Sequence, residues 1–125
     1  TNGVEVNPDN NLLYVNESAQ QKIWVYDLSE KGEVSNKRLF FESPNETGQM
    51  DGMRCDEKGN LYVTRNGKGE ITVLSPEGKV IQIIQLQGQK PSNITFSKTE
   101  TKCFVTLQDK KWIETFDACY EGRKE

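Results

Sequence analysis

Residues 51–88 read DGMRCDEKGNLYVTRNGKGEITVLSPEGKVIQIIQLQG. This stretch contains four short runs of apolar and β-branched residues, each separated from the next by a polar turn. Its Ser75-Pro76-Glu77-Gly78 motif suits a type I or type II turn, because proline presets φ and glycine accepts a positive φ. No long window shows helical periodicity, so the stretch is predicted to form antiparallel strands.

The same order of strands and turns recurs before and after this stretch, in residues 2–42 and 92–118. The repeat length is about 40 residues, which is the sequence signature of a repeat architecture. The first two units have four predicted strands and the last has three. The predicted strands are Val4–Val6, Leu12–Val15, Ile23–Tyr26 and Lys37–Phe41; Met53–Cys55, Leu61–Thr64, Glu70–Leu74 and Val80–Leu86; and Ile94–Phe96, Cys103–Leu107 and Trp112–Phe116.

Four antiparallel strands in each unit of about 40 residues are typical of the blades of a β-propeller. An antiparallel sandwich is the alternative, but sandwiches rarely repeat a whole four-stranded unit. We therefore predict an all-β chain, 1–125, that forms part of a propeller. The blades are expected at about 2–42, 49–88 and 90–118.

The composition excludes several classes of function. The chain has 125 residues, a formal net charge of −3, and Lys and Arg residues spread along its length, which argues against a nucleic-acid partner. No apolar run approaches the roughly 20 residues that span a bilayer, and we recognise no signal peptide, so we expect no membrane partner and a cytoplasmic location. Histidine is absent, which removes Ser-His-Asp and Cys-His catalysis and most zinc sites.

Each unit begins with a polar residue just before its first strand, namely Asn2, Asp51 and Ser92. The innermost strands of a propeller line a central tunnel, so equivalent positions in successive blades point at one axis. An Asn and an Asp facing that axis present hard oxygen ligands, which suit calcium or another oxygen-preferring divalent ion. Asn-Gly and Asp-Gly are also ordinary turn formers, and it is their recurrence at one phase of the repeat that favours a site.

Three segments resemble motifs of the gluconolactonase, senescence-marker-protein and luciferin-regenerating-enzyme family. The string Asn2-Gly3-Val4-x-x-x-Pro8-Asp9, followed by Leu13-Tyr14-Val15, resembles its NGL-x-x-SPDG…LYV segment. The string Asp51-Gly52-Met53-x-x-Asp56-x-x-Gly59-Asn60-Leu61-Tyr62-Val63 is similar to its PDGM…D-x-x-GNLYV signature, with Met50 in place of the usual proline. The segment 91–96, PSNITF, looks like a third element that opens a late blade. The resemblance covers nearly the whole chain and corresponds to the C-terminal half of the family.

The resemblance implies a six-bladed propeller that binds one divalent cation at its axis. The implied ligands are a Glu near the family's N-terminus, the Asn of NGL and the Asp of PDGM. The last two correspond to Asn2 and Asp51, and the Glu has no counterpart in this chain. The cation is expected to be Ca²⁺, with Zn²⁺ or Mg²⁺ as alternatives.

The activity that the resemblance implies is metal-dependent hydrolysis of a lactone, with the lactone as the small-molecule partner. Asp51 would both ligate the metal and act as general base. Asn93 is a weaker candidate for a tunnel residue. The alternative function is a non-catalytic propeller fragment or binding module that lacks a complete active site.

Three units of about 40 residues cannot close a six-bladed ring. The chain is therefore expected to be a piece of a longer protein, or one half of a homodimer that completes the propeller head to tail, or a half-propeller with covered ends. In the homodimer, the axis would hold Asn2 and Asp51 from each chain. The charged tail, 121–125, is expected to be solvated and frayed.

Overall fold

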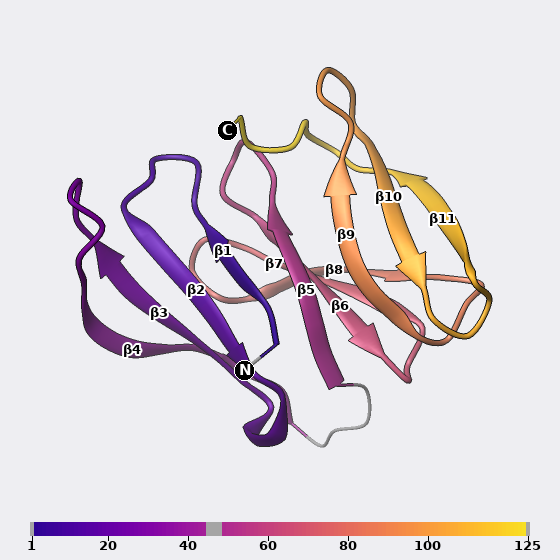
Figure 1. Cartoon of the computed structure of the whole chain (residues 1–125), viewed down its shortest axis with the longest axis horizontal. Helices are drawn as coiled ribbons and strands as arrows, with labels where there is room; N and C mark the ends of the chain where they lie inside the picture. The colour runs from indigo at the N-terminus through magenta and orange to yellow at the C-terminus, as the bar shows by residue number, and fades with distance from the viewer. Residues whose placement is uncertain (1, 45–48, 125) are drawn as a thin grey trace.

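The computed structural model describes residues 2–44 and 49–124, which form three antiparallel sheets (Figure 1). The first sheet has the order β1-β2-β3-β4, the second β5-β6-β7-β8, and the third β11-β10-β9. The strands are β1 (Val4–Val6), β2 (Leu12–Glu17), β3 (Lys22–Leu28), β4 (Val34–Glu42), β5 (Gln49–Cys55), β6 (Leu61–Asn66), β7 (Glu70–Leu74), β8 (Val80–Gln85), β9 (Pro91–Phe96), β10 (Lys102–Leu107) and β11 (Trp112–Asp117). A short 3-10 helix, η1 (Ser18–Gln20), joins β2 to β3.

The predicted all-β fold is confirmed, and every predicted strand overlaps one strand of the structure. Within each sheet, neighbouring strands in the sequence are also neighbours in space, which is the meander that a propeller blade requires. The third sheet has three strands within the described residues. Its outermost strand is β11, and a fourth strand equivalent to β4 and β8 is not present in this part of the chain.

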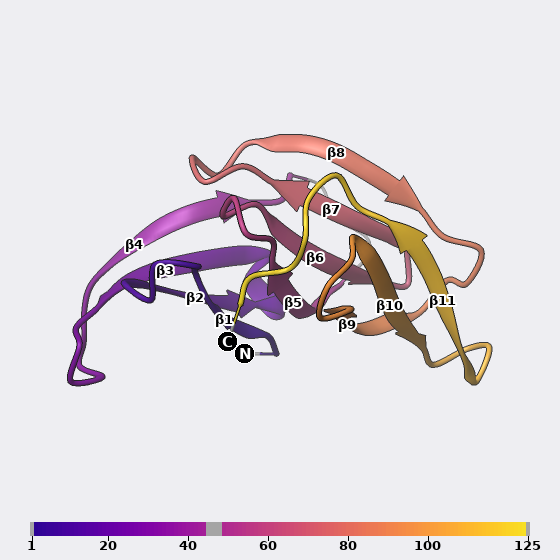
Figure 2. The ribbon, with the colours of Figure 1, turned by 90° about the horizontal axis from the view of Figure 1, so that it is seen from above.

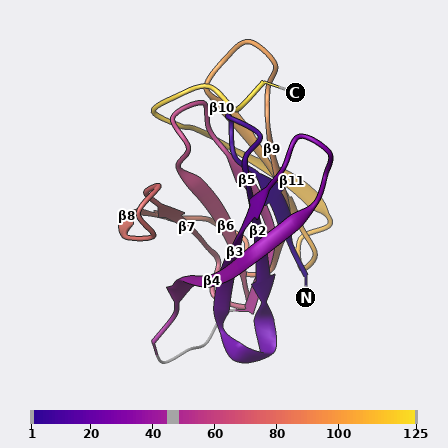
Figure 3. The same ribbon diagram turned by 90° about the vertical axis from the view of Figure 1, so that its left-hand side faces the viewer.

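The three sheets fan out around their first strands, as Figure 2 shows. Strands β1, β5 and β9 lie on the inner, concave side of the arch, and β4, β8 and β11 lie along its outer side. Strands β1 and β9 both contact β5, so the inner strands lie side by side. The N-terminal end of the chain lies at one end of these strands and the C-terminal end at the other (Figure 1, Figure 3).

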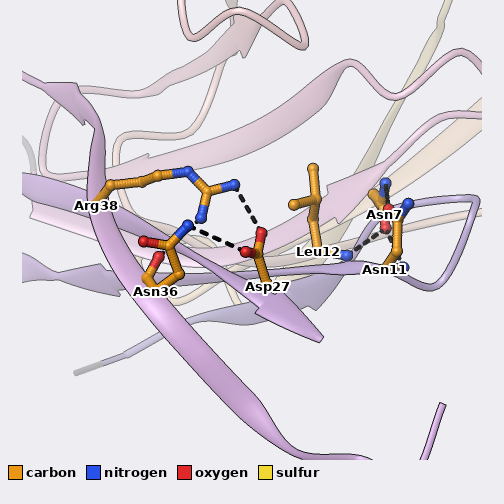
Figure 4. Close-up of polar contacts among 6 residues, drawn as sticks. All are labelled: Asn7, Asn11, Leu12, Asp27, Asn36 and Arg38. Carbon is orange, nitrogen blue, oxygen red and sulfur yellow. Dashed lines mark hydrogen bonds and ion pairs between the residues drawn. The ribbon is translucent and has the colours of Figure 1, made fainter. Parts of the chain in front are cut away.

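Polar side chains fix the turns and the outer edge of the first sheet (Figure 4). In the turn between β1 and β2, Asn7 Oδ1 accepts hydrogen bonds from the backbone N–H groups of Asn11 and Leu12, both at 2.9 Å. At the outer edge, Asp27 of β3 pairs with Arg38 of β4 at 2.9 Å and accepts a hydrogen bond from the Asn36 amide at 3.1 Å. These hydrogen bonds, from Asn36 first and Arg38 second, lower the pKa of Asp27.

The turn between β7 and β8 has the geometry that its sequence predicts. Gly78 has φ of +83°, and its N–H donates to the carbonyl oxygen of Ser75 at 2.8 Å. An added Cβ at Gly78 would come within 2.2 Å of the carbonyl oxygen of Phe40, because the turn packs against β4 of the first sheet. Glycine is therefore required here both by the backbone conformation and by the close approach of the neighbouring sheet.

The core fills the two spaces between adjacent sheets. One cluster joins the first and second sheets around Tyr14, Ile23, Leu61 and Leu74. The other joins the second and third sheets around Tyr62, Ile71, Ile94 and Val105. The middle sheet is thus apolar on both faces, which explains why β6 is buried along nearly its whole length.

The prediction that the tail is solvated and frayed is wrong for residues 121–123, whose backbone is paired, whereas Lys124 is exposed; residue 125 lies outside the described residues. Gly122 forms a bridge with Asp56, and the Glu57 N–H donates to the carbonyl oxygen of Glu121 at 2.7 Å. Arg123 forms an ion pair with Glu5 of the first sheet at 3.0 Å. The C-terminal segment therefore crosses back from the third sheet and ties it to the other two.

None of the helices in 2–44 and 49–124 is long and apolar enough to cross a membrane.

Candidate functional site

The residues that begin the three repeats gather around one hollow. It has a volume of about 290 Å³ and lies along the start of β1, the middle of β5 and the start of β9. All three sheets contribute to its lining, and the polar residues at the starts of the repeats are among the contributors: Asn2, Asp51, Ser92 and Asn93. Positions far apart in the sequence thus meet at the place where the repeat predicts the axis.

Two glycines permit the close approach of the inner strands. A Cβ at Gly3 would lie 2.3 Å from the carbonyl oxygen of Asp51, and a Cβ at Gly52 would lie 2.2 Å from Oδ1 of Asn93. Each glycine follows the candidate ligand of its own sheet and contacts the inner strand of the next sheet. Any larger residue would push adjacent inner strands apart and widen the hollow.

We expect Gly52→Ala to destabilise the chain by about 1–3 kcal/mol, the usual cost of inserting a methyl group into a filled space. The added Cβ would also meet the Cα of Asn93 at 2.7 Å, so a side-chain rotation cannot relieve the overlap. Urea unfolding measures the change. Ser92→Ala, at the neighbouring inner strand, is the control and should change stability by less than about 0.5 kcal/mol; an equal loss in both variants would contradict the close-approach argument.

The side chain of Asn2 is held with its carbonyl oxygen available. Its Nδ2 donates to the carbonyl oxygen of Met50 at 3.1 Å and also to Oγ of Ser18. These two acceptors fix which end of the amide is the nitrogen. Within the described part of the chain no hydrogen-bond donor contacts Oδ1 of Asn2, so this oxygen is available to coordinate a cation.

The carboxylate of Asp51 lies in a partly buried position and has no hydrogen bond or ion pair with any described residue. Burial raises the pKa of Asp51 above its usual value. A carboxylate that has lost part of its hydration without gaining a donor is destabilised, and a bound cation would compensate for that loss. Asp51 is therefore the strongest single candidate for a metal ligand in the hollow.

Ser92 and Asn93 are less available. The Ser92 hydroxyl lies 2.9 Å from the Thr106 hydroxyl of its own sheet. Oδ1 of Asn93 accepts a hydrogen bond from the backbone N–H of Ile94 at 2.9 Å. Of the positions that begin the repeats, Asn2 and Asp51 are thus the two that present an uncommitted oxygen.

Asn16 was not singled out by the sequence analysis, yet it holds the site together. It is fully buried, with 0% of its surface exposed. Its Oδ1 accepts from the N–H groups of Gly3 and Asn2, at 2.9 and 3.2 Å, and its Nδ2 donates to the carbonyl oxygen of Asp51 at 2.7 Å. One amide thereby fixes the backbones of both candidate ligands. The available signal was a polar residue directly after the predicted strand Leu12–Val15, two positions beyond Tyr14 and so on the same face of an extended strand.

The donor set fits a hard divalent cation. Asn2 and Asp51 offer only oxygen, which is the ligand type of Ca²⁺ and Mg²⁺. Among the described residues no group of three or more His, Cys, Asp and Glu side chains could hold a metal. Glu5 lines the same hollow, but its carboxylate is occupied by the N–H groups of Val6 and Cys55, at 3.0 and 2.7 Å, and by Arg123. Glu5 therefore does not replace the glutamate that the resemblance implies.

Comparison with known proteins gives a consistent result. Residues 1–108 match the family model described as the SMP-30/gluconolactonase/LRE-like region. The chain is similar to the diisopropyl-fluorophosphatase of Loligo vulgaris, with 31% identity over 115 residues that cover 90% of the chain and 37% of that protein.

Two solved structures extend the comparison. A calcium-binding regucalcin from Agrobacterium tumefaciens superposes with a TM-score of 0.84 at 19% identity, over 99% of this chain and 47% of that one. A gluconolactonase from Xanthomonas campestris superposes with a TM-score of 0.73 at 27% identity, over 85% of this chain and 34% of that one. The chain thus spans less than half the length of each of these relatives.

Proposed function

Because the chain belongs to the SMP-30/gluconolactonase/LRE-like family, we propose that it contributes the metal-binding part of a lactone-hydrolysing propeller. The observation that carries the proposal is the Asp51 carboxylate, which has no described partner and lines the same hollow as Asn2. The substrate class is a cyclic ester. The names of two relatives, a gluconolactonase and a sulfogluconolactonase, support this class.

The divalent cation would polarise the carbonyl of the lactone and stabilise the charge that develops on its oxygen. Residues of the chain bind the cation and take up the proton. Asn2 and Asp51 supply oxygen ligands, and Asn16 holds both of them at the axis. Asp51 also accepts the proton of the attacking water as a general base.

We propose Ca²⁺ as the cation, because the two ligands are an amide and a carboxylate oxygen and no histidine is present in the sequence. The similarity to the Agrobacterium tumefaciens regucalcin, which is described as a calcium-binding protein, supports the same choice. Two protein ligands do not fill the six to eight positions that calcium takes, so further oxygens must come from water, from substrate, or from additional protein.

The additional protein ligands of the cation could come from two sources, which correspond to two kinds of assembly. They come from the rest of a longer chain, or from the Asn2 and Asp51 of a second copy placed head to tail. Light scattering at micromolar concentration, with and without calcium, measures which arrangement the 125-residue chain adopts. A dimer that forms in calcium supports the two-copy ring, and a monomer in both conditions removes it.

The second candidate function is a non-catalytic propeller module. It is favoured by the occupied state of Glu5, which leaves Asp51 as the one carboxylate in the hollow that has no described partner. An assay of lactone hydrolysis with and without added calcium separates the two functions. Calcium-stimulated hydrolysis that disappears in Asp51→Asn, and persists in the control Asp9→Asn, supports the lactonase. Hydrolysis that is absent, or unchanged by Asp51→Asn, supports the non-catalytic module.

Calcium affinity is expected to fall as the pH is lowered through the raised pKa of Asp51. Protons and calcium compete for the same carboxylate, so the loss begins at a higher pH than it would for an ordinary Asp.

Without metal the dependence on pH has the opposite sign. Between the unfolded and the folded pKa of Asp51 the folded state binds more protons, so this group's contribution to stability decreases as the pH rises. Thermal melts across the acidic to neutral range, with calcium or with chelator, measure both effects. A calcium-dependent shift in melting temperature that stays constant over this range would contradict the role of Asp51.

A further inference from the structure

A second hollow lies at the other end of the inner strands, beneath the C-terminal segment 120–124. Its volume is about 490 Å³. Its lining comes from β5, from the end of β9 and the turn that follows it, and from the C-terminal segment. Its polar lining residues include Arg54, Ser97, Lys98, Arg123 and Lys124.

The hollow is rich in positive charge although the chain as a whole is not. Four of its lining residues are Lys or Arg, whereas the formal net charge of the chain is −3. Two carboxylates compensate part of this charge, since Glu5 pairs with Arg123 and Glu121 with Lys124, at 3.0 and 2.8 Å. The ammonium group of Lys98 has no ion pair or hydrogen bond with the described residues, which leaves it available for a ligand.

Ser97 adds an unsatisfied donor beside Lys98. Its Oγ is buried and has no hydrogen-bond partner within the described residues. A buried hydroxyl without a hydrogen-bond partner lowers the stability of the fold, and a bound acceptor would remove this penalty. Ser97 and Lys98 directly follow β9, and both residues line the hollow.

The C-terminal segment builds one wall of this hollow and is fixed by its backbone. The Arg123 N–H donates to the carbonyl oxygen of Cys55 at 3.1 Å. Gly122 lies so close to β9 that an added Cβ would be 2.5 Å from the Cβ of Phe96. Lys124 reaches across the opening and donates to the carbonyl oxygen of Lys98 at 2.9 Å. The backbone at Gly122 and Arg123 is therefore fixed against β5 and β9.

We propose that this hollow binds a small anion that carries a phosphate group. A phosphate offers several charged oxygens in a tetrahedral arrangement, which matches a hydroxyl and several cationic donors arriving from three segments. A single carboxylate would satisfy fewer of these donors. The site has four cationic lining residues, of which Arg54 also lines the Asn2–Asp51 hollow, and it does not depend on the proposed lactonase activity.

Titration with inorganic phosphate tests the proposal, with ionic strength held constant by sodium chloride and without calcium. We expect a saturable rise in melting temperature, with the affinity confirmed by calorimetry. Ser97→Ala and Lys98→Gln should each weaken phosphate binding by about tenfold, the size expected for losing one donor to a charged group. Lys79→Gln, at the exposed β7–β8 turn, is the matched control and should bind phosphate like the unmodified chain.

Ser97→Ala provides a second readout. Because its hydroxyl has no described partner, this variant should be as stable as the unmodified chain without phosphate and less stable than it with phosphate. Asp51→Asn should leave phosphate binding unchanged. The proposal is overturned if phosphate gives no saturable shift, if acetate at the same concentration gives an equal shift, or if Lys98→Gln and Lys79→Gln respond alike.

Discussion

Replacing Arg123 with alanine lowers the free energy of unfolding by about 3–5 kcal/mol, because it leaves a buried carboxylate without its cation. The side chain of Glu5 is 5% exposed and that of Arg123 is 14% exposed, and their charged atoms lie 3.0 Å apart. The backbone N–H groups of Val6 and Cys55 still donate to the carboxylate in the variant. These two donors satisfy the oxygens but do not neutralise the charge.

Urea unfolding of Arg123→Ala measures this loss of stability. Two further variants test whether the unpaired charge of Glu5 causes it. Lys124→Ala breaks the exposed pair with Glu121, whose side chains are 62% and 37% exposed, and should cost less than about 1 kcal/mol. Glu5→Gln combined with Arg123→Ala removes the unpaired charge and should recover part of the loss. Equal effects of Arg123→Ala and Lys124→Ala would show that the C-terminal segment does not tie the sheets together.

Replacing Tyr62 with alanine is the second large effect, with an expected loss of about 3–5 kcal/mol. Tyr62 is 1% exposed and lies between the second and third sheets. Its ring centroid is 5.2 Å from that of Phe96, edge to face, and 6.4 Å from that of Phe116, nearly parallel. Removing the ring leaves a cavity that both sheets line, so the third sheet should loosen first.

Tyr62→Phe measures the contribution of the hydroxyl to stability separately from that of the aromatic ring. Tyr62 is 1% exposed, and this burial raises the pKa of its hydroxyl. The phenylalanine variant keeps the aromatic contacts and should cost less than about 1.5 kcal/mol. Hydrogen exchange of β9 to β11 reports on the third sheet in each variant. Unchanged protection of these strands in Tyr62→Ala would contradict the view that this ring joins the sheets.

The fold was predictable because each unit carries its own local signals. The strand bounds of β1 and β7 match the prediction at both ends, since polar turns delimit these strands on either side. Strand β4 begins at Val34, earlier than the predicted Lys37, and the pairing of β3 with β4 shifts register around Asp27. Asn36, at φ of +57°, has a conformation that the alternation of apolar residues does not indicate.

The candidate site was predictable in part. The phase of the repeat places Asn2 and Asp51 at equivalent positions, and the structure brings both into one hollow. The role of Asn16 was not predictable, because its hydrogen bonds reach across to the backbone of a neighbouring sheet. The pairing of Glu5 with Arg123 joins residues near opposite ends of the sequence, and no local pattern indicates such a contact.

Isothermal titration of calcium into the 125-residue chain is the most direct test of the central claim, that Asn2 and Asp51 bind a divalent cation. We predict saturable binding that is lost in Asp51→Asn, weakened in Asn2→Ala and retained in Asp9→Asn. At a calcium concentration of about 100 times Kd, binding should also stabilise the fold by about 2.7 kcal/mol. A stoichiometry of one calcium for two chains would indicate the two-copy ring. The absence of saturable binding at millimolar calcium, or equal binding by Asp51→Asn, would contradict the account.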